Sequence, residues 1–158
     1  MNARPPYHGP ATGGIPPIAR LLGLSGLLPQ LAAVALLLSG DPQSRYSALA
    51  IAYAYAALIL SFLGGLWWGI AASQPNPPEW LWVAAIAPSL IALGSAVPWA
   101  TGQPWPGPSL VILGVALIAA LAVDFVLARH RLVPEWWISL RLPLSLGLGG
   151  LTLALAFA

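Results

Sequence analysis

The chain has 158 residues, of which 59% are hydrophobic and 6% are charged, and its mean hydropathy is +0.83. No soluble domain of this length needs so few charges, so the composition indicates an integral membrane protein. A formal net charge of +2 is too small to suggest a nucleic-acid partner, and the absence of cysteine excludes disulfides and thiolate chemistry.

Residues 1–14 are rich in proline, glycine and polar side chains, which predicts a disordered cytoplasmic tail before a single transmembrane domain at 15–158. The first span is predicted at about 17–39, before the helix-stop pattern Gly40-Asp41-Pro42. A signal peptide cleaved near Ala33-Val34-Ala35 is the alternative. The apolar run continues past that point at full membrane length, which favours a span.

The second span, at about 46–72, carries small residues on one face. Ser61, Gly65 and Gly69 recur every four residues, and Gly64 lies beside them. Small residues at this spacing let another helix approach closely, so we expect helix packing here. The alternative is that the glycines leave room for a lipid or a small molecule.

The third span is predicted at about 79–98. Asn76 and Glu79 have the spacing of a capping box, with Pro77 at the first helical position, so Glu79 is interpreted as a helix-start residue. The fourth and fifth spans are predicted at about 108–131 and 134–158.

The resulting fold class is all-α, a polytopic membrane protein with a bundle of five transmembrane helices. Prolines inside three of the spans predict kinks, at Pro29, Pro88 and Pro143. Five arginines against one favour an N-terminus inside and a C-terminus outside. The arginines on the predicted inner side are Arg4, Arg20, Arg129, Arg131 and Arg141, whereas Arg45 is on the outer side.

Asp124 is the acid that lies inside a span, and Arg141 lies in the next one. If the last two spans form a hairpin with its midpoint between Leu132 and Val133, the two residues are equidistant from the turn and lie at the same depth. Each charge alone is costly to bury, so we expect a structural ion pair. A transport role for the acid is the alternative.

Other residues fall near the same inner level. Arg131 follows Asp124 by two helical turns and is a second possible partner, and Arg20 lies about one turn inside the first span. Together they predict a pocket in the inner leaflet for an anionic lipid headgroup, a quinone or a small solute. The expected pocket residues are Arg20, Trp67, Trp68, Asp124, Arg131 and Arg141.

Gly23-Leu24-Ser25-Gly26 resembles the motif around the nucleophile of rhomboid intramembrane proteases, but that chemistry requires a histidine on a neighbouring span. His8 lies in the predicted tail and His130 in a predicted turn, so we expect small-residue packing instead. No catalytic residue, metal site or cofactor is expected.

Three polar side chains inside the spans remain. Gln30, Tyr53 and Tyr55 are expected to form hydrogen bonds between helices, with a solute path as the alternative.

Several short elements from residue 16 onward resemble a bacterial family of uncharacterised membrane proteins, a domain of unknown function that includes mitochondrial transmembrane protein 69. The resemblance implies an inner-membrane helical bundle without an established activity. In that family a basic or imidazole side chain often stands where this chain has Trp67, so an activity that needs a titratable group there is not expected. The matching elements are Leu22–Pro29, Leu60–Gly65, Trp68-Gly69, Pro88-Ser89, Asp124, Pro134–Trp136 and Leu140-Arg141.

These observations favour a non-enzymatic structural or accessory protein of the bacterial inner membrane. We expect it to lie in the lipid bilayer and to associate through its small-residue faces with itself or with a larger membrane complex. The alternative is a binding or transport protein that uses the inner-leaflet pocket.

Overall fold

A computed structural model describes residues 14–103 and 105–158, and the regular elements within these ranges are all helices. The predicted disordered tail lies outside the described residues, apart from Gly14. The helices are α1 (Pro17–Ser25), α2 (Leu28–Leu38), α3 (Pro42–Ser73), α4 (Glu79–Gly94), α5 (Val97–Ala100), α6 (Gly107–Arg129) and α7 (Trp137–Ala156).

Within the described ranges, five helical segments are long and apolar enough to cross a membrane, because α1 with α2 and α4 with α5 each make one span. The chain is therefore an all-α, multi-pass membrane protein, as predicted. The spans are Pro17–Leu38, Pro42–Ser73, Glu79–Ala100, Gly107–Arg129 and Trp137–Ala156.

Proline explains where two of the spans break. A proline in a helix clashes with the carbonyl group four residues earlier. Pro29 lies four residues after Ser25, where α1 ends, and Pro98 lies four residues after Gly94, where α4 ends. The predicted kink of the first span is thus a full helix break. The third span breaks before Pro98, which was not predicted, whereas α4 continues through Pro88.

The second span begins four residues earlier than predicted. Asp41 is the N-cap of α3, and its carboxylate accepts hydrogen bonds from the backbone N–H and the hydroxyl of Ser44, at 2.9 and 2.6 Å. These bonds lower the pKa of the Asp41 carboxyl from its ordinary value. Pro42 takes the first helical position, where its missing N–H costs no hydrogen bond.

The predicted capping box before α4 is wrong. Helix α4 begins at Glu79 with Pro78 as its N-cap, and no side chain caps this end. The reason is the sequence Pro77-Pro78, because a residue before proline is driven out of the helical region. Pro77 therefore cannot be the first helical residue, and Asn76 lies too far from the helix to cap it.

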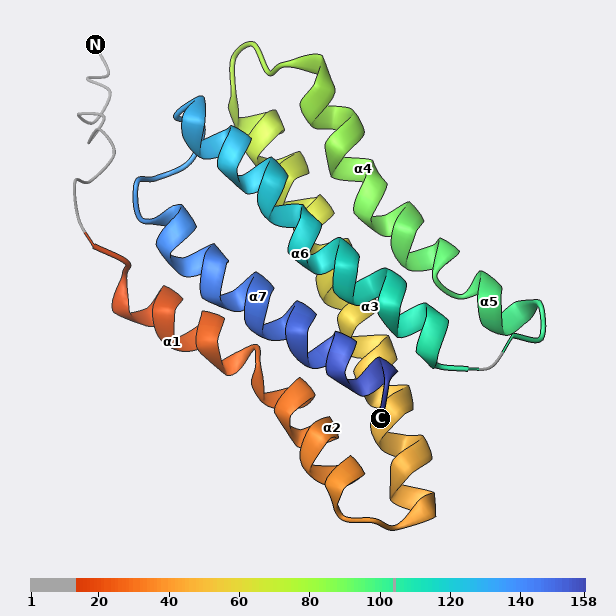
Figure 1. Ribbon diagram of the computed structural model, residues 1–158. Helices are drawn as coiled ribbons and strands as arrows, with labels where there is room; N and C mark the ends of the chain where they lie inside the picture. Colours follow the sequence, from red (N-terminus) through yellow and green to blue (C-terminus); the bar gives the residue numbers. More distant parts are fainter. Residues whose placement is uncertain (1–13, 104) are drawn as a thin grey trace, which may run out of the picture.

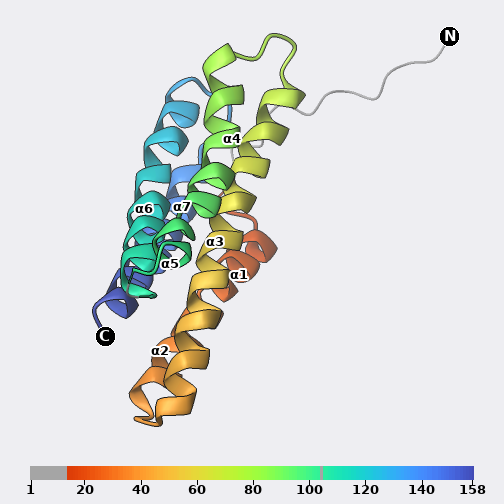
Figure 2. The ribbon, with the colours of Figure 1, turned by 90° about the vertical axis from the view of Figure 1, so that its right-hand side faces the viewer.

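The helices form one elongated bundle in which α7 lies between α6 and α1 (Figure 1). Helix α3 packs against α2, α4, α6 and α7. The hairpin of α2 and the start of α3 extends beyond the other helices, at the end where the C-terminus lies (Figures 1 and 2).

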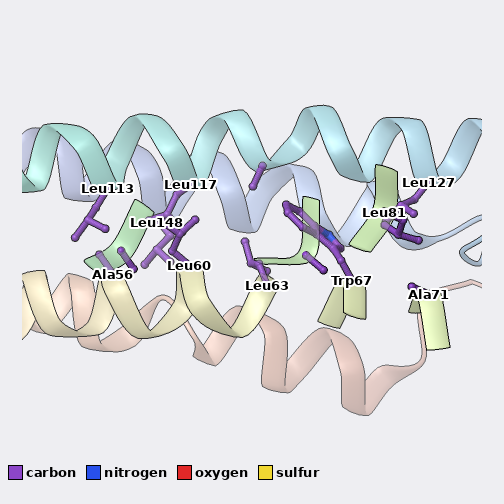
Figure 3. Close-up of a cluster of buried hydrophobic side chains, with 13 residues drawn as sticks. Ala56, Leu60, Leu63, Trp67, Ala71, Leu81, Leu113, Leu117, Leu127 and Leu148 are labelled. Carbon is purple, nitrogen blue, oxygen red and sulfur yellow. The ribbon is translucent and has the colours of Figure 1, made fainter. Parts of the chain in front are cut away.

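Leucines between α3, α6 and α7 form the centre of the core, which alanines and Leu81 of α4 complete. Leu60 and Leu63 of α3 meet Leu113 and Leu117 of α6 and Leu148 of α7, and all five are buried (Figure 3). Trp67 of α3 extends this core toward the predicted inner end of the bundle. The core thus extends along the bundle as far as Asp124, which Trp67 contacts.

Glycines bring two pairs of helices into close contact. A Cβ at Gly64 would collide with the carbonyl oxygen of Ala85, so α3 and α4 touch through their backbones. A Cβ at Gly114 would lie 3.0 Å from the carbonyl oxygen of Gly149, and one at Gly149 would lie 2.9 Å from that of Gly114. This mutual contact fixes α6 against α7 and leaves no room for a larger residue in either helix.

The expected packing face of the second span does not pack within this chain. Gly65 and Gly69 are exposed, and a Cβ at either would meet nothing within 4 Å. Ser61 is half-buried. The buried glycine is their neighbour Gly64, because the rotation of α3 turns that residue, rather than the spaced trio, toward α4.

Candidate functional site

Among the described residues, oppositely charged side chains contact each other inside the bundle at one place, around Asp124. This residue lies on α6 and is fully buried. Its Oδ2 accepts a hydrogen bond from Arg141 Nε on α7 at 2.8 Å, which is also an ion pair. Arg141 is 8% exposed. The structure therefore brings together the two residues that were expected to lie at the same depth.

Two indole groups complete the shell around the carboxylate. Trp67 Nε1 on α3 and Trp137 Nε1 on α7 each donate a hydrogen bond to Asp124 Oδ1 at 3.1 Å. With the guanidinium, the carboxylate has three donors from two neighbouring helices. A buried carboxylate needs such donors to replace water, so the four residues form a closed and electrically neutral centre.

The turn between α6 and α7 sets this register. After Arg129 the Leu132 N–H donates to the Leu127 carbonyl oxygen at 2.9 Å, and the Arg131 N–H donates to that of Ala128 at 3.0 Å. This is the Schellman pattern of a helix end, and Arg131 occupies its left-handed position with φ 55°. The chain then reverses into α7.

Several of the expected pocket residues lie away from Asp124. Arg131 is exposed, because α6 ends two residues before it and the chain there turns away from the helix axis. Arg131 is therefore not a second partner of Asp124, contrary to the expectation. Arg20 is exposed on α1, and Trp68 is 48% exposed and packs edge-to-face on Trp82. The predicted six-residue pocket is therefore not formed as one site.

A second polar contact lies toward the other end of α7. Gln30 Nε2 on α2 donates to Thr152 Oγ1 at 2.7 Å and approaches the Ala52 carbonyl oxygen of α3 at 3.4 Å. Both side chains are fully buried. The expectation that Gln30 joins helices is thus confirmed.

The two tyrosines also join elements, as predicted. The Tyr53 hydroxyl lies 3.2 Å from that of Ser95, and the Tyr55 hydroxyl donates to the Gly26 carbonyl oxygen at 2.5 Å. Gly26 lies at the break between α1 and α2, where helical bonding is interrupted, so Tyr55 satisfies a carbonyl group that the break leaves open.

Ser25 does not resemble a nucleophile in this structure. It is exposed, and its hydroxyl donates to the carbonyl oxygen of Leu22 at 2.8 Å. Gly23 faces Leu140 and Leu144 of α7, where an added Cβ would lie 3.2 Å from each. The glycine of this motif therefore serves close helix packing, as the sequence indicated.

A cavity of about 170 Å³ lies beside the Asp124 centre, between the α1–α2 break, α3, α6 and α7. Arg141 and Ser145 are its polar lining residues, and the others are apolar or glycine. Within the described residues, Arg141 Nη2 and Ser145 Oγ are buried without a hydrogen-bond partner. Nothing in the sequence pattern distinguished Ser145 from the other small residues of α7.

Comparisons with known proteins agree with this architecture. The family model described as "Protein of unknown function (DUF3429)" matches residues 15–158. Transmembrane protein 69 from Xenopus tropicalis is 33% identical over 139 residues, which cover 85% of this chain and 52% of the relative. The chain thus spans about half the length of that curated relative. No solved structure shows a significant match. The chain belongs to the DUF3429 family of membrane proteins.

Proposed function

We propose that this chain is a non-enzymatic structural protein of the bacterial inner membrane, and that it assembles with a second copy of itself through the Gly65 and Gly69 face of α3. The observation that carries the proposal is the exposure of these two glycines, which the fold of a single chain does not require.

The closed state of the Asp124 centre supports a structural role. Proton transfer or acid–base chemistry needs a carboxylate that a substrate or water can reach. Asp124 is fully buried, and both of its oxygens accept hydrogen bonds from Trp67, Trp137 or Arg141. The group that would be the first choice for chemistry in a membrane therefore joins α3, α6 and α7 instead.

The groove on α3 supports self-association. Gly65 and Gly69 lie in a hollow on the lipid-facing side of the helix, where an added Cβ would be in open space. In hydrocarbon, helices associate where small residues let their backbones approach. Two copies inserted with the same orientation can place these faces against each other, because a two-fold interface uses one patch twice. The hollow is lined by Phe62, Gly65, Leu66, Gly69, Ile70 and Ser73.

Disulfide cross-linking in native membranes tests this interface directly, because the chain has no cysteine of its own. Gly65→Cys and Gly69→Cys should each give a covalent dimer on mild oxidation. Ala122→Cys is the matched control, since Ala122 is exposed on α6 close to the level of Asp124, which Trp67 contacts. On oxidation this variant should give no covalent dimer.

A bulky residue should separate the copies without unfolding either one. Gly65→Leu places its side chain in open space within one chain, so the melting temperature in detergent should stay close to that of the wild type. The dimer fraction measured by native mass spectrometry should fall. Equal cross-linking of Gly65→Cys and Ala122→Cys, or a monomeric wild-type protein in native membranes, would contradict the proposal.

A further inference from the structure

We propose that the cavity beside Arg141 and Ser145 binds a lipid-soluble molecule through a neutral carbonyl oxygen. The cavity lies among the membrane-spanning helices, and Phe62 is the one lining residue that it shares with the α3 groove used for self-association. Its volume is about 170 Å³. The residues that line it are Leu22, Gly23, Gly26, Leu27, Ile59, Phe62, Leu63, Leu117, Arg141, Leu144, Ser145 and Leu148.

Two unpaired polar atoms identify the cavity as a binding site. Arg141 and Ser145 are one helical turn apart on α7 and are 8% and 3% exposed. Arg141 Nη2 and Ser145 Oγ have no hydrogen-bond partner among the described residues. Buried polar groups in native proteins are almost always paired, so two unpaired groups on residues that line the cavity indicate a missing acceptor.

The charge balance favours a neutral acceptor over an anion. Arg141 is already neutralised by Asp124 at 2.8 Å, so the centre as a whole carries no net charge. An anionic headgroup drawn into the cavity would bring a second negative charge without a second cation, which is costly at this depth. A carbonyl oxygen accepts hydrogen bonds from both donors and adds no charge.

The shape of the site fits the end of an apolar molecule. Apolar cavities of roughly 150 Å³ hold a molecule the size of benzene, so this cavity admits one ring or a short stretch of chain. Leu22 on α1 and Phe62 on α3 line it and are each 63% exposed, so it opens toward the lipid. Two molecules supply this chemistry: a quinone, or the ester of a phospholipid.

The first experiment uses the full chain in nanodiscs of ether-linked phosphatidylcholine, which has no ester carbonyl. A short-chain benzoquinone is added, and melting is followed by circular dichroism. The wild-type melting temperature should rise in a saturable way. Ser145→Ala should weaken the apparent affinity roughly fivefold, as expected for the loss of one hydrogen bond.

Ser109→Ala is the matched control. Ser109 is 1% exposed and its hydroxyl is also unpaired, but it lies on α6 outside the cavity. Its substitution should leave the quinone response unchanged. Ile59→Phe should fill the cavity and abolish the response. The melting of each variant is first measured without quinone to show that it folds. If Ile59→Phe does not fold, Ser145→Ala alone tests the proposal.

The second experiment compares nanodiscs of ether-linked and ester-linked phosphatidylcholine with the same chains and headgroup. A higher wild-type melting temperature in the ester lipid, absent in Ser145→Ala, identifies a phospholipid ester as the ligand. A response to the quinone alone identifies a quinone. The proposal is overturned if neither responds, if Ser145→Ala and Ser109→Ala behave alike, or if only ether-linked phosphatidylglycerol stabilises the protein.

Discussion

Two buried polar contacts lie toward opposite ends of α7, and they differ in charge. The contact at Asp124 joins α3, α6 and α7 through an ion pair and two indole donors. The contact at Gln30 joins α2, α3 and α7 through neutral groups. A charge left unpaired in a membrane core is far more costly than an amide left unpaired, so the first contact should dominate the stability of the bundle.

Asp124→Asn should give the largest effect, because it leaves the guanidinium of Arg141 buried without its counter-ion. Breaking a buried pair in this way costs about 3–5 kcal/mol. Folded yield and melting temperature in detergent should both fall sharply. Glu135→Gln removes an exposed acid near the same end of the bundle and should change neither.

Adding Arg141→Leu to Asp124→Asn should recover part of that loss, since the buried cation is then removed as well. The double variant thus separates the cost of an orphaned charge from the value of the pair. If Asp124→Asn alone melts like the wild type, the ion pair does not hold the helices together.

Trp137→Phe should come next in size. It removes one of the two indole bonds to Asp124 Oδ1 and keeps the carboxylate paired with Arg141. Hydrogen bonds to charged groups contribute about 1.5–3 kcal/mol. Trp136→Phe is the matched control, because the neighbouring ring packs on Trp137 at 6.1 Å without bonding Asp124. Equal losses of melting temperature would assign the effect to packing alone.

The sequence predicted the charged contact better than its surroundings. Hydropathy fixed the five spans, and the turn at residues 130–136 placed Asp124 and Arg141 at one depth. The sequence did not predict that the indole N–H groups of Trp67 and Trp137 would donate hydrogen bonds to Asp124. A tryptophan near a span end resembles an interface anchor in sequence, whether its N–H faces headgroups or a buried carboxylate.

The sequence also did not predict the rotation of each helix about its own axis, which decides the face that packs against its neighbours. In water a polar face marks the side that points outward, but lipid-facing and core-facing sides of a membrane helix are equally apolar. The sequence therefore could not show that Gly64 would face α4 while Gly65 and Gly69 faced outward. It also could not pair Gly114 with Gly149, which requires knowing the faces of two helices at once.

Gln30→Leu should cost only about 1 kcal/mol, the net value of one neutral hydrogen bond. Thr152 remains satisfied because its hydroxyl donates to the Leu148 carbonyl oxygen at 2.7 Å. The change also removes Gln30 Oε1, which is buried without a partner. A melting loss as large as that of Asp124→Asn would show that the two contacts do not differ in the way their charges suggest.

The smallest expected effect is a gain, from Arg131→Gly in the turn that sets the register of the charged contact. A non-glycine residue in the left-handed region costs about 1–2 kcal/mol, and Arg131 has φ 55°. Glycine removes that strain but has more freedom to lose on folding, so the net gain should stay below about 1 kcal/mol. Arg131→Ala removes the same charge but keeps the strain, so the melting temperature should rise only for Arg131→Gly. A rise of equal size in both variants would assign the effect to charge and not to the backbone of the turn.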